Sequence, residues 1–283
     1  MLELISEHAC FGGAQRFYSH HSEAIGLPMR FSVFLPPQAR EGKVPALFCL
    51  AGLTCTEETF MIKAGAQRSA AQQGLMLITP DTSPRGANLP GEADSWDFGV
   101  GAGFYLDATE APWNKHYRMY SYVLELYELI VREFPVLLSS IGITGHSMGG
   151  HGALVLALRN PDLFKTVSAF APICAPSKCP WGVKAFTAYL GSEQEAWQQY
   201  DASALMKQRH APFPSGILID QGLSDKFLSN QLFPHAFEAV CQAAQQPLEL
   251  RWHDDYDHGY YFISTFIEEH IRFHHRKLGG IAQ

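Results

Sequence analysis

The sequence lacks any long apolar run. No stretch approaches the roughly 18 consecutive apolar residues that a membrane-spanning helix needs. The N-terminal segment 1–8 carries acidic residues where a secretory signal requires basic ones, and it has no apolar core. These absences argue against membrane insertion and export, and we expect a soluble, cytoplasmic protein that makes no membrane contact.

The chain also has few clustered positive charges. Its longest basic group is the short segment 274–277, and the net charge is −7 with a pI near 6.0. Nucleic-acid-binding proteins usually show a basic patch or stripe, so we expect no nucleic-acid partner. Six cysteines are scattered without the spacing of a zinc site, which favours free thiols and no metal.

Repeats, low-complexity tracts and linkers are absent as well. The 283 residues are 47% hydrophobic, which is enough for one large core. We therefore expect a single domain over residues 1–283. Strands are expected at 31–35, 45–51, 75–79, 140–144, 166–171, 216–220 and 247–253.

Helical periodicity lies between most of these strands. One helix is expected to follow Thr56 or Glu57, either of which could cap it, and to run on through the alanine-rich stretch to residue 71. Alternation of strand and helix predicts an α/β fold with a mostly parallel, doubly wound sheet, preceded by antiparallel N-terminal strands. The other helices are expected at 120–134, 148–159, 230–245 and after residue 259.

Two segments do not fit this alternation. Residues 81–116 form a long connection rich in glycine and aromatic residues, which suggests either the wall of a binding site or a self-packed surface loop. Residues 173–210 contain Pro, Trp and Tyr in short irregular pieces. We interpret this second segment as an insertion beside the active site.

The most informative motif is Gly145-His-Ser147-Met-Gly149, a G-x-S-x-G sequence between an expected strand and an expected helix. In such a nucleophile elbow the serine occupies a strained turn, and the two glycines let strand and helix approach closely. The start of the helix presents free N–H groups to an oxyanion. We expect Ser147 to be a nucleophile.

A serine nucleophile needs a base, and the base needs an acid that orients it. In elbow hydrolases these follow in the order Ser, Asp or Glu, His, each in a loop after a strand. Asp225 follows the expected strand 216–220, and His258 follows the expected strand 247–253. The carboxyl ends of parallel strands meet at one edge of a sheet, so Asp225 and His258 are the expected acid and base.

Several rivals remain at this point. Asp220 is expected inside its strand, and His253 ends the last strand. Asp254, Asp255 and Asp257 lie too close to His258 in sequence to reach its far ring nitrogen easily. Most of the 13 histidines must be structural or solvated, although His146 adjoins Ser147 and could line the site. The structural group is expected to comprise His146, His151, His210, His235, His270, His274 and His275.

The oxyanion formed during acyl transfer needs two N–H donors. One is expected from Met148, directly after the nucleophile, and the other from the loop after an earlier strand. Gly52-Leu53 follows the expected strand 45–51, so the Leu53 N–H is the second candidate.

Longer motifs make the chain resemble the S-formylglutathione hydrolase family, also called the esterase D family. The extended elbow Gly145-His-Ser-Met-Gly-Gly-His-Gly-Ala-Leu154 carries part of this resemblance. The other matching motifs span nearly the whole chain: Phe48-Cys-Leu-Ala-Gly-Leu-Thr-Cys-Thr-Glu-Glu-Thr-Phe60, Pro80-Asp-Thr-Ser-Pro-Arg-Gly86, Asp94-Ser-Trp-Asp-Phe-Gly99, Gly101-Ala-Gly-Phe-Tyr105, Asp225-Lys-Phe-Leu228 and Tyr256-Asp-His-Gly-Tyr-Tyr-Phe-Ile263.

The resemblance implies an α/β-hydrolase fold and hydrolysis of S-formylglutathione to formate and glutathione, a step of formaldehyde removal. It implies the same roles for Ser147, Asp225 and His258, a side activity on short carboxylesters and no cofactor. Members of the family are often homodimers, so a homodimer is expected here too.

Substrate contacts are a further hypothesis. Trp181, Phe104 and Arg85 are expected to flank the glutathione part of the substrate, and Trp96 and His146 are further candidates. Cys55 lies two residues beyond Leu53, so alkylation of its thiol is expected to block the site, unless it is simply a small buried thiol.

Three other functions remain open on the sequence alone. The chain could be a general short-acyl carboxylesterase, such as an acetyl esterase, with no preference for the thioester. It could also be a catalytically silent hydrolase fold that serves as a binding module, although the intact triad argues against this. An acyltransferase would require an acceptor groove and secretion.

Overall fold

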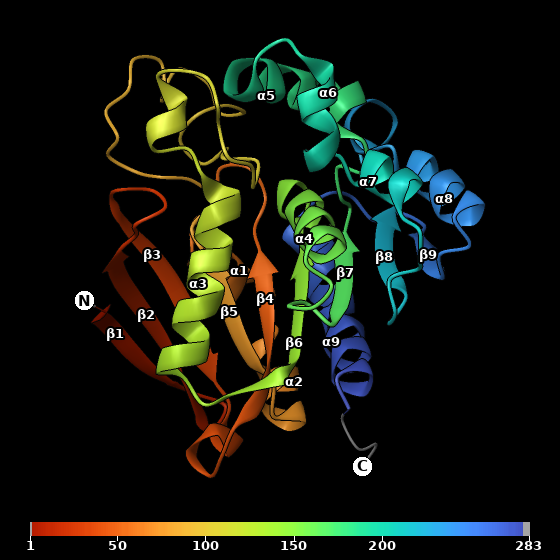
Figure 1. The fold of residues 1–283 in the computed structure, drawn as a ribbon. Helices are drawn as coiled ribbons and strands as arrows, with labels where there is room; N and C mark the ends of the chain where they lie inside the picture. Colours follow the sequence, from red (N-terminus) through yellow and green to blue (C-terminus); the bar gives the residue numbers. More distant parts are fainter. Residues whose placement is uncertain (1, 280–283) are drawn as a thin grey trace.

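The computed structural model describes residues 2–279, and their framework is a nine-stranded sheet in the order β1-β2-β3-β5-β4-β6-β7-β8-β9 (Figure 1). The strands β4 to β9 pair in parallel with one another, whereas β1, β2 and β3 pair antiparallel, as does β3 with β5. The strand bounds are β1 Leu2–Cys10, β2 Gly13–His21, β3 Pro28–Leu35, β4 Val44–Leu50, β5 Met76–Pro80, β6 Val136–Gly145, β7 Thr166–Phe170, β8 Ile217–Gly222 and β9 Leu248–His253.

Helices cover both faces of this sheet, which confirms the expected α/β fold. In Figure 1, α3 and α4 lie in front of the strands, and α1, α2 and α9 lie behind them. Central strands such as β5 and β7 are buried at every residue, because a parallel sheet covered on both faces has no solvent side. The α-helices are α1 Thr59–Lys63, α2 Gln67–Gln73, α3 Met119–Glu133, α4 Met148–Arg159, α5 Pro180–Leu190, α6 Gln194–Trp197, α7 Ala202–Gln208, α8 Pro234–Ala243 and α9 Tyr260–Lys277.

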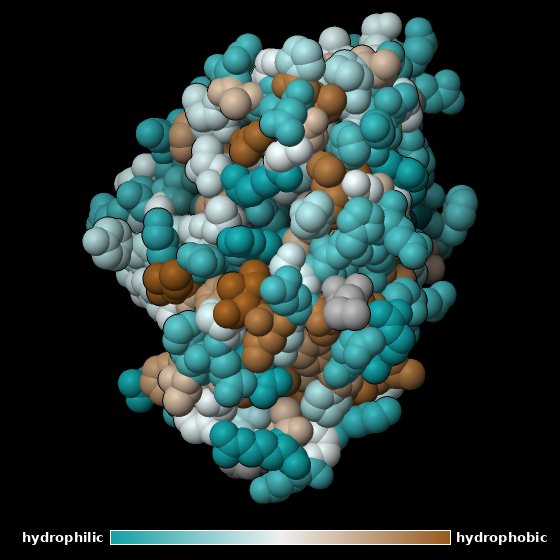
Figure 2. Space-filling model, turned by 90° about the vertical axis from the view of Figure 1, so that its left-hand side faces the viewer, coloured by the Kyte–Doolittle hydropathy of each residue, from teal (hydrophilic) through white to brown (hydrophobic). Residues whose placement is uncertain are grey.

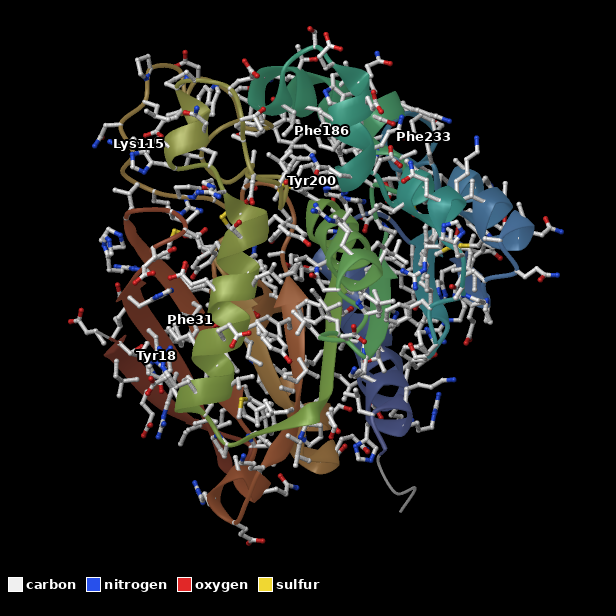
Figure 3. The ribbon with its side chains drawn as sticks, viewed as in Figure 1. Tyr18, Phe31, Lys115, Phe186, Tyr200 and Phe233 are labelled. Carbon is white, nitrogen blue, oxygen red and sulfur yellow. The ribbon has the colours of Figure 1, made fainter. Side chains whose placement is uncertain are left out.

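The antiparallel strands carry an aromatic layer beneath α3. Tyr18 of β2 and Phe31 of β3 stack with 5.3 Å between ring centroids, and Phe134 meets Tyr18 edge-on at the end of α3 (Figure 3). Tyr18 and His20, two residues apart on β2, are buried and both contact Phe31 in this layer. The layer joins the N-terminal strands to the parallel part of the sheet.

The prediction of one helix over residues 56–71 is wrong in two respects. The structure has two short helices, α1 and α2, because Gly65 between them adopts a positive φ of 69° that an α-helix does not tolerate. Neither Thr56 nor Glu57 caps α1; Glu58 occupies that position and makes no side-chain cap.

The expected helix over 230–245 is also shorter than its apolar pattern suggests. Residues 228–232 form a π-helical turn, η5 Leu228–Leu232, and Phe233 then adopts a φ of 50°. The helix α8 therefore begins at Pro234, whose missing N–H suits the first helical position.

The insertion at 173–210 is helical rather than irregular. It contains α5, α6 and α7, which lie beyond the upper, carboxyl ends of the parallel strands in Figure 1. Pro180 starts α5 at a permitted position, and the Asp201 side chain caps α7 by accepting from the Ala204 N–H at 3.0 Å. The long connection at 81–116 packs its aromatic residues against α5, with Phe98 stacked 4.6 Å from Tyr189.

The face at the β1 end of the sheet is mostly hydrophilic, with small apolar areas between polar ones (Figure 2). Leu4 and Ile5 of β1 are exposed, as is common for single apolar side chains on a surface. Within residues 2–279, no helix combines the length and apolar character needed to cross a membrane.

Candidate active site

Ser147 occupies the sharp turn between β6 and α4. Its backbone has φ 58° and ψ −118°, a conformation that non-glycine residues rarely adopt, and only the surrounding structure can hold it there. A Cβ on Gly145 would lie 2.1 Å from the carbonyl oxygen of Gly149, so no side chain fits at the crossing of strand and helix. The expected elbow is confirmed in its geometry.

The side chains of Ser147, His258 and Asp225 form one hydrogen-bonded line. His258 Nε2 lies 2.9 Å from Ser147 Oγ, and His258 Nδ1 lies 2.6 Å from Asp225 Oδ2. A carboxylate can only accept, so the Nδ1–H donates to Asp225 and Nε2 is left to accept the serine proton. The structure therefore brings together the three residues that the sequence predicts.

Asp225 is itself fixed by its neighbours. Its side chain has no exposed surface; Oδ1 accepts the Phe227 N–H at 2.8 Å, and Oδ2 accepts from Gln221 Nε2 at 3.3 Å. Gln221 lies within β8 and Asp225 just beyond it. A buried carboxylate held in this way can orient an imidazole without swinging away from it.

The rival acid Asp220 belongs to a different cluster. Its carboxylate accepts two hydrogen bonds of 2.6 Å from Arg251, and His253 and His270 lie within 3.4 Å of it. Arg251 provides the charge that a fully buried carboxylate needs. Asp220 thus holds β8, β9 and α9 together, and it makes no contact with Ser147 or His258.

A second polar cluster continues from His270 into the sheet. His270 Nδ1 lies 2.8 Å from Ser168 Oγ, which also contacts His274 Nε2 at 2.8 Å. His274 Nδ1 lies 2.6 Å from Thr166 Oγ1. These serine and histidine residues are fully buried, so no substrate can reach them and we assign them a structural role.

Two backbone N–H groups near Ser147 are free to bind an oxyanion. Within residues 2–279, neither the Leu53 N–H nor the Met148 N–H donates to any protein acceptor. The loop of Leu53 follows β4, which pairs with β6 up to Leu50 opposite Gly145. A Cβ on Gly52 would lie 3.2 Å from the Cβ of Ser147, so this loop passes directly beside the nucleophile.

His146 forms one wall of the site. Its ring lies 4.6 Å from the ring of His258 and 5.7 Å from that of Tyr260, measured between centroids. Burial, and then the charge of His258, hold the pKa of His146 well below its usual value, so its ring is neutral. Within the described part of the chain, neither ring nitrogen has a hydrogen-bond partner.

Aromatic side chains lead from His258 to the surface. Phe227 meets the ring of His258 edge-on at 5.0 Å, Trp181 of α5 packs 4.6 Å from Phe227, and Trp96 meets Trp181 edge-on at 5.5 Å. Trp181 is nearly buried, whereas Trp96 is 56% exposed. The two expected tryptophans are therefore linked to His258 through Phe227, which lies in the motif at 225–228.

Two other expected substrate contacts are placed differently. Phe104 is fully buried among core residues, including Phe186 of α5, so it cannot touch a bound substrate in this structure. The guanidinium of Arg85 donates twice to Asp81, at 2.7 and 2.9 Å, and once to the Cys55 carbonyl oxygen at 3.1 Å. Both residues are engaged by the protein itself, and the sequence pattern gives no sign of this.

Cys55 follows the oxyanion loop, as expected, and is partly buried. Burial raises the pKa of its thiol, although the hydroxyls of Thr59 and Tyr260 act in the opposite direction. The thiol is therefore mostly protonated near neutral pH and is a weak nucleophile. Among residues 2–279, no group of three or more His, Cys, Asp or Glu side chains is arranged to hold a metal ion.

Comparison with known proteins agrees with this geometry. The family model Esterase, described as "Putative esterase", matches residues 22–273. The chain is 55% identical to S-formylglutathione hydrolase of Rattus norvegicus over 281 residues, covering 99% of each chain. It is 52% identical to S-formylglutathione hydrolase of Arabidopsis thaliana, covering 98% of each chain.

A solved structure shows the same likeness in three dimensions. The S-formylglutathione hydrolase of Agrobacterium tumefaciens superposes with a TM-score of 0.95 at 49% identity, covering 98% of this chain and 99% of that one. Identity at this level over nearly the full length, together with the geometry of Ser147, His258 and Asp225, establishes that the chain belongs to the S-formylglutathione hydrolase family.

Proposed function

We propose that this protein hydrolyses S-formylglutathione to formate and glutathione through a formyl-enzyme intermediate on Ser147. The observation that carries the proposal is the line of hydrogen bonds from Ser147 through His258 to Asp225, in a chain of this family. The free N–H groups of Leu53 and Met148 beside the nucleophile support it.

In the first half of the reaction, Ser147 Oγ attacks the formyl carbon while His258 Nε2 takes its proton. The carbonyl oxygen becomes an oxyanion and accepts hydrogen bonds from the Leu53 and Met148 N–H groups. Asp225 stabilises the imidazolium that forms and holds the ring in place. The C–S bond then breaks. The glutathione sulfur leaves as a thiol by taking the proton from His258, or as a thiolate, in which case His258 passes its proton to solvent before the second half.

In the second half, a water molecule replaces glutathione. His258 accepts a proton from this water, whose oxygen attacks the formyl carbon of the ester on Ser147. The same two N–H groups hold the second oxyanion. Collapse of that intermediate breaks the ester bond, His258 returns the proton to Ser147 Oγ, and formate leaves.

A small acyl group suits the space around Ser147. The residue is only 3% exposed, and the backbone of Gly52 passes against it. The aromatic residues Phe227, Trp181 and Trp96 offer apolar surface beyond His258, where the glutathione part would lie. Short carboxylesters would react by the same steps as a side activity.

The test is thioester hydrolysis by the wild-type protein and by Ser147→Ala. The expected result is efficient release of glutathione from S-formylglutathione by the wild type and none above background by Ser147→Ala. Rates on p-nitrophenyl acetate, measured side by side, address the second candidate, a general short-acyl carboxylesterase. A wild-type enzyme that cleaves this ester well and the thioester poorly would contradict the proposal.

A fluorophosphonate probe examines the third possibility, a silent fold. The proposal requires the probe to label Ser147 in the wild type and not in Ser147→Ala.

We further infer a cytoplasmic location and a homodimer, which the family resemblance supports. Cell fractionation and light scattering would test these two points separately, and a monomer in solution would contradict the second.

A further inference from the structure

The loop that carries the oxyanion donor Leu53 has an unfavourable backbone. Thr54, the next residue, adopts a φ of 69°, which lies in the left-handed region that side chains other than glycine avoid. Its N–H donates to the Gly101 carbonyl oxygen at 2.9 Å. A Cβ on Gly101 would lie 3.0 Å from the Cα of Thr54, so the two segments are in close contact.

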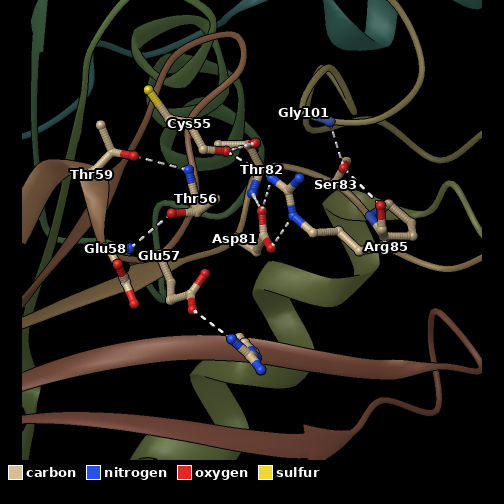
Figure 4. A network of polar contacts seen from close by, with 12 residues as sticks. Cys55, Thr56, Glu57, Glu58, Thr59, Asp81, Thr82, Ser83, Arg85 and Gly101 are labelled. Carbon is tan, nitrogen blue, oxygen red and sulfur yellow. Dashed lines mark hydrogen bonds and ion pairs between the residues drawn. The ribbon is translucent and has the colours of Figure 1, made fainter. Parts of the chain in front are cut away.

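The far side of this loop is held at the carbonyl oxygen of Cys55. That oxygen accepts a hydrogen bond of 2.5 Å from Thr82 Oγ1 and one of 3.1 Å from Arg85 Nη2 (Figure 4). Both donors belong to the loop after β5, which runs parallel to β4 and ends at the same edge of the sheet. Two side chains thus fix a single backbone oxygen two residues beyond Leu53.

Asp81 fixes the two donors in turn. Its buried carboxylate accepts from Arg85 Nε at 2.7 Å, from Arg85 Nη2 at 2.9 Å and from the Thr82 N–H at 2.7 Å. The same Nη2 atom therefore bridges Asp81 and the Cys55 carbonyl oxygen. Ser83 completes the arrangement, because its hydroxyl accepts the Gly101 N–H at 2.7 Å and links the two segments that hold the loop.

We propose that Asp81, Thr82 and Arg85 position the Leu53 N–H for the oxyanion, by holding the Cys55 carbonyl oxygen of its loop. They are positioning residues, since none of them touches the reacting atoms. This inference rests on the proposed function only in that Leu53 is taken as an oxyanion donor. It gives Arg85 a role different from binding a carboxylate of the substrate.

The size of the effect follows from what an oxyanion donor contributes. Removing one donor lowers turnover by roughly 10²–10³-fold, and a misplacement near 1 Å can cost about 10²-fold. Loosening the loop displaces the donor without removing it. We therefore expect a loss in kcat of about 10–100-fold, with KM changed by less than about threefold, because the effect falls on the transition state.

Thr82 provides the sharpest test, because its hydroxyl can be removed without changing its shape. Thr82→Val deletes the donor in a fully buried position, and Thr82→Ser keeps it. The expected result is the loss in kcat for Thr82→Val and its recovery to within about threefold of wild type for Thr82→Ser. A boronate that forms a tetrahedral adduct on Ser147 should bind Thr82→Val more weakly by a similar factor.

Arg85→Met tests the second donor, with Arg132→Met as its control. Arg132 of α3 pairs with Glu133 on the surface, far along the chain from the loop. Arg85→Met should lower kcat on both S-formylglutathione and p-nitrophenyl acetate, whereas Arg132→Met should change neither. Arg85→Lys keeps the charge but cannot bridge two acceptors in the same way, and its kcat should lie between those of wild type and Arg85→Met.

Thermal unfolding of each variant separates loss of positioning from loss of fold. A folded Thr82→Val or Arg85→Met with wild-type kcat would overturn the proposal. A rise in KM limited to S-formylglutathione would also overturn it and would assign Arg85 to substrate binding instead. If Thr82→Val fails to fold, Arg85→Met decides, since its half-exposed side chain is less critical to the core.

The two proposals can fail independently. If wild type hydrolyses p-nitrophenyl acetate but not S-formylglutathione, the proposed substrate is wrong, yet the effect of Thr82→Val is still measured on the ester. If wild type cleaves the thioester and Thr82→Val does so equally well, only the positioning role is wrong.

Discussion

The imidazole rings of His146 and His258 lie 4.6 Å apart between centroids at the nucleophile elbow, inclined by 47° to each other. Only His258 reaches Ser147 and Asp225. Burial keeps His146 neutral, and a positive charge on His258 lowers the pKa of His146 further. The base of the reaction therefore has a neighbour that does not take up a proton in its place.

This relationship predicts the acid limb of the pH–rate profile. Because His146 stays neutral, it should add no ionisation of its own to this limb, and log kcat/KM should fall with a slope no greater than one as the pH drops. His146→Phe keeps a ring in the same place and should retain that slope. A slope of two in the wild type that becomes one in His146→Phe would show that His146 also titrates, contrary to our expectation.

Asp225 and Asp220 should respond differently to the same substitution. Asp225→Asn removes the acceptor that orients His258 and should lower kcat by roughly 10⁴-fold with little effect on stability. Asp220→Asn leaves Arg251 without its buried partner and should cost about 3 kcal/mol in the free energy of unfolding.

Urea unfolding and steady-state kinetics on both variants provide the measurement. The folded fraction of Asp220→Asn should keep most of its turnover, because this carboxylate contacts no reacting group. A large loss of kcat in folded Asp220→Asn, with Asp225→Asn active, would mean that the acid of the triad has been misassigned.

The buried histidines predict acid sensitivity. Burial lowers the pKa of His151 to about 4, and that of His274 lies well below its usual value. In the unfolded chain these histidines have their ordinary pKa near 6.5. The unfolded chain therefore binds more protons than the folded protein between about pH 4 and 6.5. Because stability rises with pH wherever the unfolded state binds more protons, the free energy of unfolding should fall as the pH drops below about 6.5.

His151→Gln isolates one of these groups. Glutamine can still donate to the Phe104 carbonyl oxygen, which His151 Nε2 contacts at 2.9 Å, but it does not titrate. The variant should lose less stability than wild type between pH 6.5 and 4, by roughly 3 kcal/mol at the acid end. His210→Gln, at an exposed position, is the control, and equal pH dependence in all three proteins would refute the idea.

Cys55 should react slowly with alkylating reagents at neutral pH. Burial raises the pKa of its thiol, and the thiolate is the reactive form, so labelling by iodoacetamide should accelerate as the pH rises. Once attached, the added group would press on the oxyanion loop and should abolish turnover. Cys55→Ala should be active and insensitive; full activity in labelled wild type, verified by mass spectrometry, would contradict the blocking effect.

Sequence patterns predicted the parts of this molecule that depend on local chemistry. The helix at 148–159 was expected from its motif and has those bounds, because glycine spacing and apolar periodicity agree there. The order Ser147, Asp225, His258 follows from the chain order of elbow hydrolases, and the rule that parallel strands end at one edge places Asp225 and His258 together. The comparisons confirm the family and the α/β fold that the motifs implied.

Other features depend on contacts that a linear pattern does not encode. Gly65 divides an alanine-rich stretch that favours one helix, because its backbone adopts a φ of 69°, which the alanine periodicity does not reveal. Arg85 carries a charge suited to a substrate carboxylate, but its guanidinium forms an ion pair with Asp81, four residues earlier in the chain. Phe104 stands in a glycine-rich segment typical of a surface, yet its ring is fully buried.

The strand order places the base at the margin of the sheet. Within residues 2–279, β9 is the last strand in the sheet order and pairs with β8 alone. Its residues are all partly or fully exposed, and the turn bearing His258 follows it directly. Outermost strands open more readily than central ones, so their amides exchange hydrogen with solvent earlier. Low concentrations of urea should therefore abolish activity while most of the fold is intact, because local unfolding of β9 would displace His258. The loss of activity would then measure the unfolding of this one strand at the edge of the sheet.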